Sequence, residues 1–193
     1  MKRWLHLGLI LLLCCGVIGA PAQADEKPQK EKKKREVYSA TAMAVAGVAG
    51  GGTLSLTLYI DDYTTDEEAV QLAQTLKSGG SDALLKAMEK LNKGRVAVVG
   101  RTGNQVAIIR SRPTEKGRRI IMVTDRPIGF LELRRGTRSR DYEFGVIELL
   151  LDEKGKGSGT ALVAAKIKFT DKNTIEVEHY GTEPVRLVNV RAF

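Results

Sequence analysis

The sequence predicts an α+β fold: a curved or barrel-like antiparallel sheet of about eight to nine strands, with a two-helix hairpin inserted after its second strand. Two-residue alternation of apolar and polar side chains recurs along most of the chain, which is typical of half-buried strands. Short connections that contain glycine join these segments, so neighbouring strands are expected to be antiparallel. Two apolar stripes with helical spacing stand between the second and third expected strands. So many strands favour strong curvature or closure over a flat sheet.

The chain begins with the pattern of an export signal, residues 1–24. Residues 2–3 are basic, residues 7–19 form an apolar core of 13 residues, and residues 22–24 have the Ala-x-Ala form of a cleavage site. A membrane-spanning helix needs roughly 20 apolar residues, so this core is too short for a permanent anchor. We therefore expect an exported protein, periplasmic or secreted, with no transmembrane span after cleavage.

Cleavage at this site also limits the chemistry of the mature chain. It leaves 169 residues and removes both cysteines, Cys14 and Cys15, so that His179 is the one remaining histidine. A disulfide framework, a cysteine nucleophile and a Cys/His zinc site are thereby excluded, and we expect no metal and no cofactor. A chain of this length can bury enough apolar surface to fold without cross-links.

A charged segment follows the signal. Residues 25–36 carry ten charged side chains and no large apolar one, so we expect a solvated, disordered leader. Apolar alternation starts immediately after it. The expected organisation is therefore a signal peptide at 1–24, a charged leader at 25–36 and a single α+β domain at 37–193.

Strand patterns occupy most of this domain. Leucine and isoleucine alternate with Ser, Thr and Tyr over residues 54–60, which predicts a half-buried strand. Glycines at 50–52 separate it from an Ala/Val-rich strand, and because no helix follows them they indicate a hairpin and not a phosphate-binding loop. Further strands are expected at residues 95–100, 104–112, 118–125, 144–151, 159–169, 174–180 and 185–191.

Two helices are expected between the second and third strands. Residues 65–68 (TDEE) form a capping box at the start of the first helix, and Gly79 is expected to end it. Ser81 is the expected N-cap of the second helix. With only Gly80 between them, the two helices should form a tight hairpin whose apolar stripes cover one face of the sheet.

The register of one strand pair follows from its turn. If residues 171–173 form a three-residue turn, Lys168 faces Glu176 and Lys166 faces Glu178, while the apolar side chains of the two strands face each other. A shift by one residue would place lysines opposite apolar side chains. In this register the four charged residues pair across the two strands, so their expected role is structural.

Arginine is concentrated in one segment. The chain has 31 Lys+Arg against 23 Asp+Glu, a net charge of +8, and residues 110–140 alone carry ten basic and three acidic side chains. The planar guanidinium fork fits phosphate, sulfate and carboxylate groups. Arg112 and either Arg118 or Arg119 flank a turn, so two guanidinium groups should face each other there. The candidate anion-binding residues are Arg110, Arg112, Arg118, Arg119, Arg134, Arg135, Arg138 and Arg140.

These features favour a non-enzymatic binding protein whose arginine-rich surface holds an anionic envelope component: a lipid head group, a polysaccharide or an acidic protein. The plainer interpretation is that the arginine stems cover apolar surface while their charged heads stay in water. Export argues against nucleic acid as the partner. One alternative function is a hydrolase that depends on His179. Another is a barrel that binds an apolar ligand in a cavity lined by residues such as Leu54, Leu56, Ile108, Ile121 and Val163.

Several segments together resemble a group of exported bacterial proteins that have no assigned activity. They are YTTDEE at 63–68, LAQTLK at 72–77, SRPTEKGRR at 111–119, VTDRPI at 123–128 and SRDY at 139–142. The similarity covers most of the chain after the signal. It implies a location in the bacterial cell envelope and transfers no catalytic or binding residue.

Overall fold

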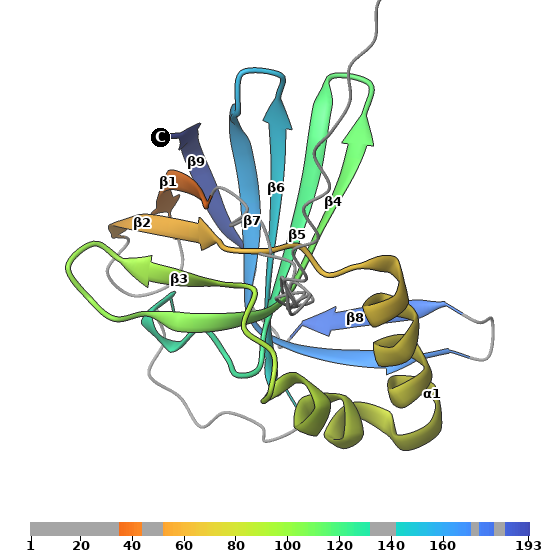
Figure 1. Cartoon of the computed structure of the whole chain (residues 1–193). Coiled ribbons are helices and arrows are strands. Elements are labelled where there is room, and N and C mark those ends of the chain that lie inside the picture. The colour runs from red at the N-terminus through yellow and green to blue at the C-terminus, as the bar shows by residue number, and fades with distance from the viewer. Residues whose placement is uncertain (1–34, 44–51, 132–141, 171–173, 180–183) are drawn as a thin grey trace, which may run out of the picture. The chain divides into compact units, whose positions relative to one another are not determined.

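The fold is known from a computed structural model that describes residues 35–43, 52–131, 142–170, 174–179 and 184–193 (Figure 1). The described residues belong to one compact unit, Lys33–Phe193. The expected signal peptide, and the leader up to residue 34, lie outside them. Within the described parts of the chain, no helix has the length and apolar character needed to cross a lipid bilayer.

The strands occur where the apolar alternation predicts them. In chain order the elements are β1 (Glu36–Met43), β2 (Thr53–Ile60), α1 (Asp66–Met88), β3 (Gly94–Val98), β4 (Asn104–Thr114), β5 (Gly117–Thr124), the 3-10 helix η1 (Gly129–Leu131), β6 (Phe144–Asp152), β7 (Lys156–Phe169), β8 (Ile175–His179) and β9 (Val185–Ala192).

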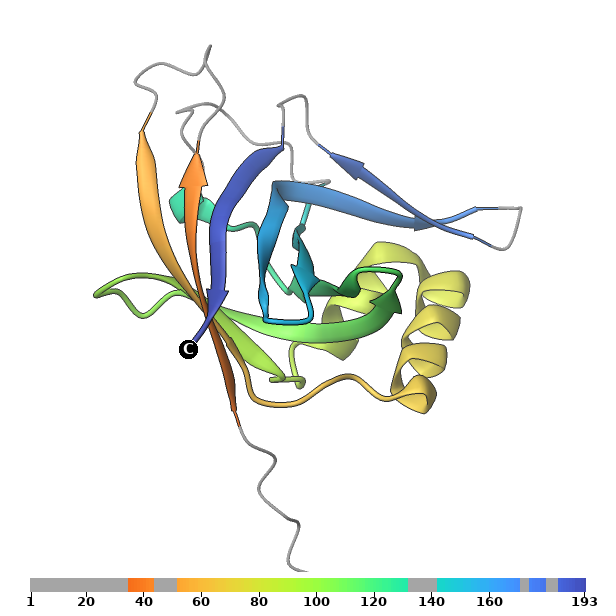
Figure 2. The ribbon, with the colours of Figure 1, turned by 90° about the horizontal axis from the view of Figure 1, so that it is seen from above.

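The sheet closes into an antiparallel barrel, which confirms the barrel-like prediction. Its strand order is β6-β5-β4-β3-β2-β1-β9-β7, and β7 also pairs with β6, so eight strands form a ring. The remaining strand, β8, pairs with the C-terminal part of β7 and extends away from the ring (Figure 2). Closure satisfies the backbone N–H and C=O groups that an open sheet would leave unpaired at its edges.

Apolar side chains fill the barrel. Leu56, Leu58 and Ile60 point inward from β2 and are at most 2% exposed. The inward residues of the other strands complete one buried cluster, to which they contribute the large, fully buried side chains of Tyr38, Ile109, Ile120, Met122 and Ile147. Burial of this apolar surface is the main stabilising contribution to the fold.

A second buried cluster lies between α1 and the outside of the barrel wall. Leu76, Leu84 and Met88 of α1 pack against Val123 and Phe144, among others. The expectation that the helical apolar stripe covers one face of the sheet is therefore confirmed. As a result, this part of the wall is buried on both of its faces.

The predicted two-helix hairpin is wrong, because the structure has a single helix over Asp66–Met88. The expected break is reduced to one non-helical residue, Gly80, with φ 71° and ψ −166°. A glycine adopts such a conformation without a Cβ clash, so one residue redirects the helix and no connecting loop is needed. Ser81, the expected second N-cap, donates its hydroxyl hydrogen bond to the backbone oxygen of Ile167 in β7 (2.8 Å). That bond anchors the kink to the sheet.

The capping box at the start of α1 is confirmed. The Glu68 N–H donates to Thr65 Oγ1 (3.2 Å), and the Thr65 N–H donates to Glu68 Oε2 (2.9 Å).

Because of these two bonds, the variant Thr65→Ala should lower the free energy of unfolding by about 1 kcal/mol, measured in urea. Thr75→Ala, the same change at a half-buried position within the same helix, is the control and should have almost no effect. Equal losses in both variants would show that the cap does not stabilise the fold.

The predicted register of β7 and β8 is confirmed. Lys166 pairs with Glu178 and Lys168 with Glu176, as the turn requires. The ion pair itself forms diagonally, between Lys168 and Glu178, and the Tyr142 hydroxyl also donates to Glu178 (3.0 Å). These exposed charged groups therefore hold β8 against β7.

Candidate functional site

The candidate arginines of the 110–140 segment fall into three groups. Arg110, Arg112 and Arg119 point outward from β4 and β5, whereas Arg118 is on the same side of β5 as the interior residue Ile120. Arg134, Arg135, Arg138 and Arg140 lie outside the described residues. The described members therefore occupy both sides of the barrel wall.

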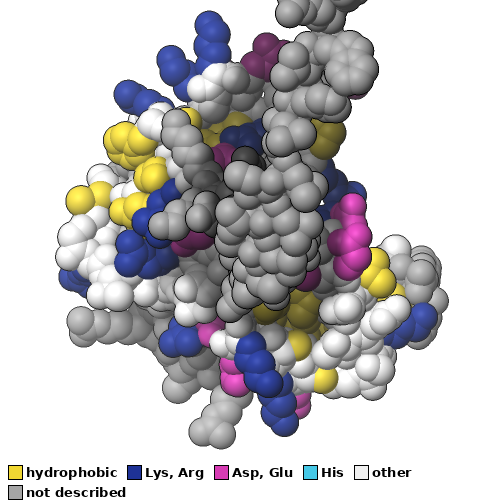
Figure 3. Space-filling model, in the orientation of Figure 1, with side chains coloured by type: hydrophobic (Ala, Val, Ile, Leu, Met, Phe, Trp, Pro, Cys, Tyr) yellow, Lys and Arg dark blue, Asp and Glu magenta, His cyan; other side chains and the backbone are white. Residues whose placement is uncertain are grey.

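The outward-facing arginines are partly compensated by carboxylates. Arg110 pairs with Asp66 and donates to the Thr64 backbone oxygen (2.8 Å), and Arg119 pairs with Glu148. Arg112 is exposed and lies directly across the ladder from Arg119, so the predicted opposition of two guanidinium groups is confirmed. On the face seen in Figure 3, Lys and Arg side chains appear at several separate places. The exposed arginine patch of residues 110–140 stays a prediction.

Arg118 belongs to a network at one end of the barrel interior. Its guanidinium group donates to Glu36 Oε2 (2.6 Å) and to the hydroxyls of Tyr38 and Tyr63. Both tyrosine hydroxyls donate in turn to Glu36, at 2.7 Å from Tyr38 and 2.9 Å from Tyr63. We call these four residues the barrel-end network. Because their polar groups form hydrogen bonds with one another, the role of Arg118 here is structural.

The network shifts the pKa values of its members. Burial and the neighbouring Glu36 carboxylate raise the pKa of Tyr38 to about 12, and the same two causes raise the pKa of Tyr63. Burial also favours a higher pKa for Glu36, but the hydrogen bonds from Tyr38, Arg118 and Tyr63 outweigh it, so the pKa of Glu36 is lowered. Glu36 is therefore ionised and both tyrosines are neutral at pH 7.

The residues named for the two alternative functions lie at different places in the described part of the structure. His179 is exposed on β8, and no group of three His, Cys, Asp or Glu side chains in the described residues is placed to hold a metal ion. Of the suggested apolar lining, Leu56 lies in the barrel core, whereas Ile108 and Ile121 pack under α1 on the outer wall. Leu54 and Val163 pack at the margin of the barrel core. Both alternatives stay predictions.

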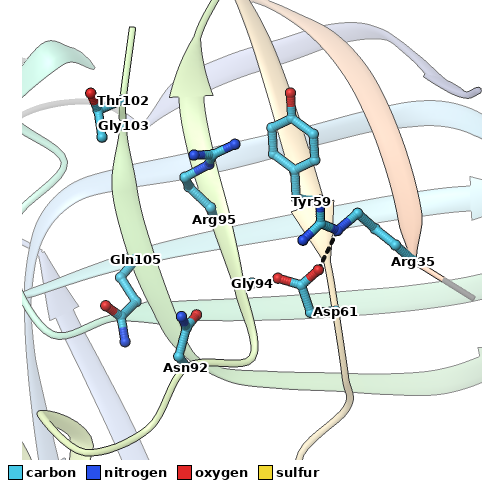
Figure 4. A pocket seen from close by; sticks show the side chains of 9 residues that line it. All are labelled: Arg35, Tyr59, Asp61, Asn92, Gly94, Arg95, Thr102, Gly103 and Gln105. Carbon is cyan, nitrogen blue, oxygen red and sulfur yellow. Dashed lines mark hydrogen bonds and ion pairs between the residues drawn. The ribbon is translucent and has the colours of Figure 1, made fainter. Parts of the chain in front are cut away.

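The structure contains a polar hollow that sequence analysis did not identify. It lies on the outer wall over β2, β3 and β4 and has a volume of about 440 Å³ (Figure 4). We call it the Tyr59 hollow; it is lined by Arg35, Tyr59, Asp61, Asn92, Gly94, Arg95, Thr102, Gly103 and Gln105. Tyr59, Arg95 and Gln105 are direct neighbours across three strands, which places their outward side chains in one row.

Two guanidinium groups flank the aromatic ring in this hollow. The guanidinium carbon of Arg95 is 4.7 Å from the centre of the Tyr59 ring, and that of Arg35 is 5.8 Å from it. Both distances allow cation–π attraction. Arg35 also pairs with Asp61. Arg95 is exposed and forms no ion pair with any described carboxylate.

The backbone and one amide shape the rest of the hollow. Gln105 Nε2 donates one hydrogen bond to the Leu91 backbone oxygen (2.8 Å), so the side-chain oxygen and the second N–H of Gln105 remain available to a ligand. Gly103 has φ 75°, and a Cβ atom there would lie 2.1 Å from the Val96 backbone oxygen. Glycine is therefore required at this position for the β3–β4 connection to pack against the wall.

Sequence analysis missed the Tyr59 hollow because its charges come from different segments. Arg35 is the last but one residue of the expected leader, and Arg95 lies in residues 37–109, where acidic residues outnumber basic ones. The available signal was the alternation along residues 54–60, which places Tyr59 on the outer side of the strand together with Ser55 and Thr57. That signal does not identify the neighbours of Tyr59 on other strands.

No protein-family model matches the chain, and no curated protein or solved structure does either. The resemblance to a group of exported bacterial proteins therefore stays a prediction.

Proposed function

We propose that the protein is a non-enzymatic binding protein for an anionic partner and that the Tyr59 hollow holds the anion. The observation that carries this proposal is Arg95, an exposed cation that stacks on Tyr59 and has no carboxylate partner among the described residues. Its guanidinium group can form two parallel hydrogen bonds to a carboxylate, sulfate or phosphate.

The position of Arg95 favours binding on physical grounds. A long side chain normally loses rotamer freedom when it binds a ligand, which costs roughly 0.5–1.5 kcal/mol. Stacking on Tyr59 already restricts Arg95, so less freedom is lost on binding. Arg35 adds a second positive charge, which a bound anion would share with Asp61.

The groups that line the hollow suit binding better than catalysis. They are guanidinium, amide, hydroxyl and phenol groups, together with the carboxylate of Asp61, which Arg35 already engages. Such groups orient a ligand through hydrogen bonds and charge. The export expected from residues 1–24 would bring the protein to anionic components of the cell envelope.

The proposal is tested by the salt dependence of binding in matched arginine variants. Heparin, polygalacturonate and anionic phospholipid vesicles serve as probes, each at low and moderate salt. Arg95→Gln should weaken binding of at least one probe about tenfold and make its affinity less dependent on salt, because one charge-assisted contact is lost. Arg186→Gln removes the same charge from an exposed site outside the hollow and should change the affinity less than twofold.

Two outcomes would contradict the proposal. Unchanged binding by Arg95→Gln would exclude the Tyr59 hollow as the site. Equal weakening by Arg95→Gln and Arg186→Gln would indicate unspecific attraction to the net positive charge. Circular dichroism of each variant shows that both remain folded.

A further inference from the structure

The Tyr59 hollow contains hydrogen-bond acceptors as well as cations. The Asp61 carboxylate and the available oxygen of Gln105 accept hydrogen bonds, and the amide of Asn92 both donates and accepts. Inorganic sulfate and fully ionised phosphate groups offer only acceptor oxygens. A ligand of that kind would leave the acceptors of the hollow without a donor, which is unfavourable.

The formal charge of the hollow fits a ligand group with one negative charge. Arg35 and Arg95 contribute two positive charges and Asp61 contributes one negative charge. A group with one negative charge neutralises the site, whereas a doubly charged group would leave an excess beside Asp61. Figure 4 shows the side chains of Asp61, Arg95 and Gln105 arranged around the same hollow.

The walls and size of the hollow indicate a polar organic ligand. Tyr59 is the one aromatic residue of the lining, and the other side chains are charged or polar apart from two glycines. Pockets of a few hundred cubic ångströms hold small organic molecules. Asn92 and Arg95 are exposed, so a polymer can cross the hollow and continue along the outer wall.

On these grounds, and resting on the proposed function, we infer that the anion is the carboxylate of an acidic sugar within a polysaccharide. A uronic acid combines one carboxylate, which suits Arg95, with neighbouring hydroxyls that can donate to Asp61 and Gln105. A phosphatidic acid head group lacks these neighbouring hydroxyl donors. An acidic peptide supplies carboxylates without the adjacent hydroxyls.

Four polymers separate the contributions of charge and hydroxyl groups. Polygalacturonate has carboxylates and hydroxyls, polyglutamate has carboxylates only, polyphosphate has acceptor oxygens, and dextran has hydroxyls without charge. We expect polygalacturonate to bind at least tenfold more tightly per binding site than each of the other three. Arg95→Gln should remove most of this preference.

The variant Asp61→Asn tests the role of the acceptor. It releases Arg35 and raises the charge of the hollow, so polyphosphate should bind several times more tightly while polygalacturonate gains little. The preference for polygalacturonate over polyphosphate should then fall about fivefold. Glu148→Gln is the matched control, because it releases Arg119 outside the hollow by the same change of charge and should leave the preference unchanged.

The outcomes distinguish this inference from the proposed function. If polyphosphate or polyglutamate binds as tightly as polygalacturonate and still depends on Arg95, the acidic-sugar inference is wrong and the proposed function stands. If binding of none of the polymers depends on Arg95 but binding of heparin or anionic vesicles does, the inference fails alone. If no probe at all depends on Arg95, the proposed function fails, and the inference fails with it. If Asp61→Asn and Glu148→Gln change the preference equally, Asp61 does not select the ligand.

Discussion

Gly159→Val is expected to lower the free energy of unfolding by about 3 kcal/mol, the upper end of the usual cost of overpacking. Gly159 lies in β7, where it pairs with Leu149 of β6 on one side and with Leu187 of β9 on the other. A Cβ atom at this position would lie 2.2 Å from the Glu148 backbone oxygen and 2.9 Å from the Leu149 side chain. A backbone oxygen cannot move aside as a flexible side chain does, so the strands must separate where the barrel closes.

Ser158→Val is the matched control for this change. It places the same side chain on the neighbouring residue of β7, which is exposed, so the free energy of unfolding should change by less than about 0.5 kcal/mol. Urea unfolding followed by circular dichroism measures both variants. If both were equally stable, close approach at Gly159 would not be required for closure. If Gly159→Val does not fold at all, Gly159→Ala, with one methyl group, should give a smaller measurable loss.

Glu36→Gln is expected to lower the free energy of unfolding by about 2 kcal/mol at pH 7. The Glu36 carboxylate accepts hydrogen bonds from Tyr38, Tyr63 and Arg118 at the end of the barrel interior. Glutamine removes the charge and presents an NH₂ group to one of these donors. Arg118 then stays partly buried without a counter-charge.

The effect of Glu36→Gln should also depend on pH. In the fold the pKa of Glu36 lies below its ordinary value of 4.5. A carboxyl group with a lowered pKa contributes stability that is fully present above the unfolded pKa and is lost as the pH falls through the folded pKa. The difference between the original protein and Glu36→Gln should therefore be constant above pH 4.5 and should shrink in more acidic solution.

Glu148→Gln provides the comparison for the Glu36 prediction. It breaks the ion pair with Arg119, the neighbour of Arg118, on the outer wall. There the Arg119 side chain is more accessible to solvent than that of Arg118. Such pairs usually contribute less than about 1 kcal/mol. A loss from Glu148→Gln as large as that from Glu36→Gln would show that the barrel-end network has no special role in stability.

Much of the local structure could be predicted from short stretches of sequence. The alternation over residues 54–60 located β2, and TDEE at residues 65–68 located the start of α1. The turn expected at residues 171–173, which lie outside the described residues, was enough to predict the register that β7 and β8 have. Each of these features depends on residues that are close in sequence, so the local pattern contains the information needed.

The kink in α1 shows where local reasoning failed. Gly79 and Gly80 indicated that the helix ends, which is the usual meaning of glycine after an apolar stripe. Whether the chain then begins a new helix or bends within one depends on what the next residue contacts. Ser81 contacts Ile167, which lies 86 positions away, so the outcome was set by tertiary packing.

The positions of Arg118 and Arg119 could not be predicted for a related reason. The residues after them in β5 are Ile120, Ile121, Met122 and Val123, all apolar, because the barrel core buries one face of the strand and α1 covers the other. The alternation that distinguishes inside from outside is therefore absent here. Only the closed barrel places Arg118 with Glu36 and Arg119 with Glu148.

The sequence by itself determined where the strands and the helix lie, how the helix begins and how one hairpin pairs, since these depend on backbone preference and side-chain alternation between near neighbours. The tertiary structure decided which faces are buried, where the helix bends and which distant charges meet, including Arg35 and Arg95 beside Tyr59. The physical reason is that barrel closure selects among pairings of distant strands by their combined burial and hydrogen bonding, and no single segment contains that information.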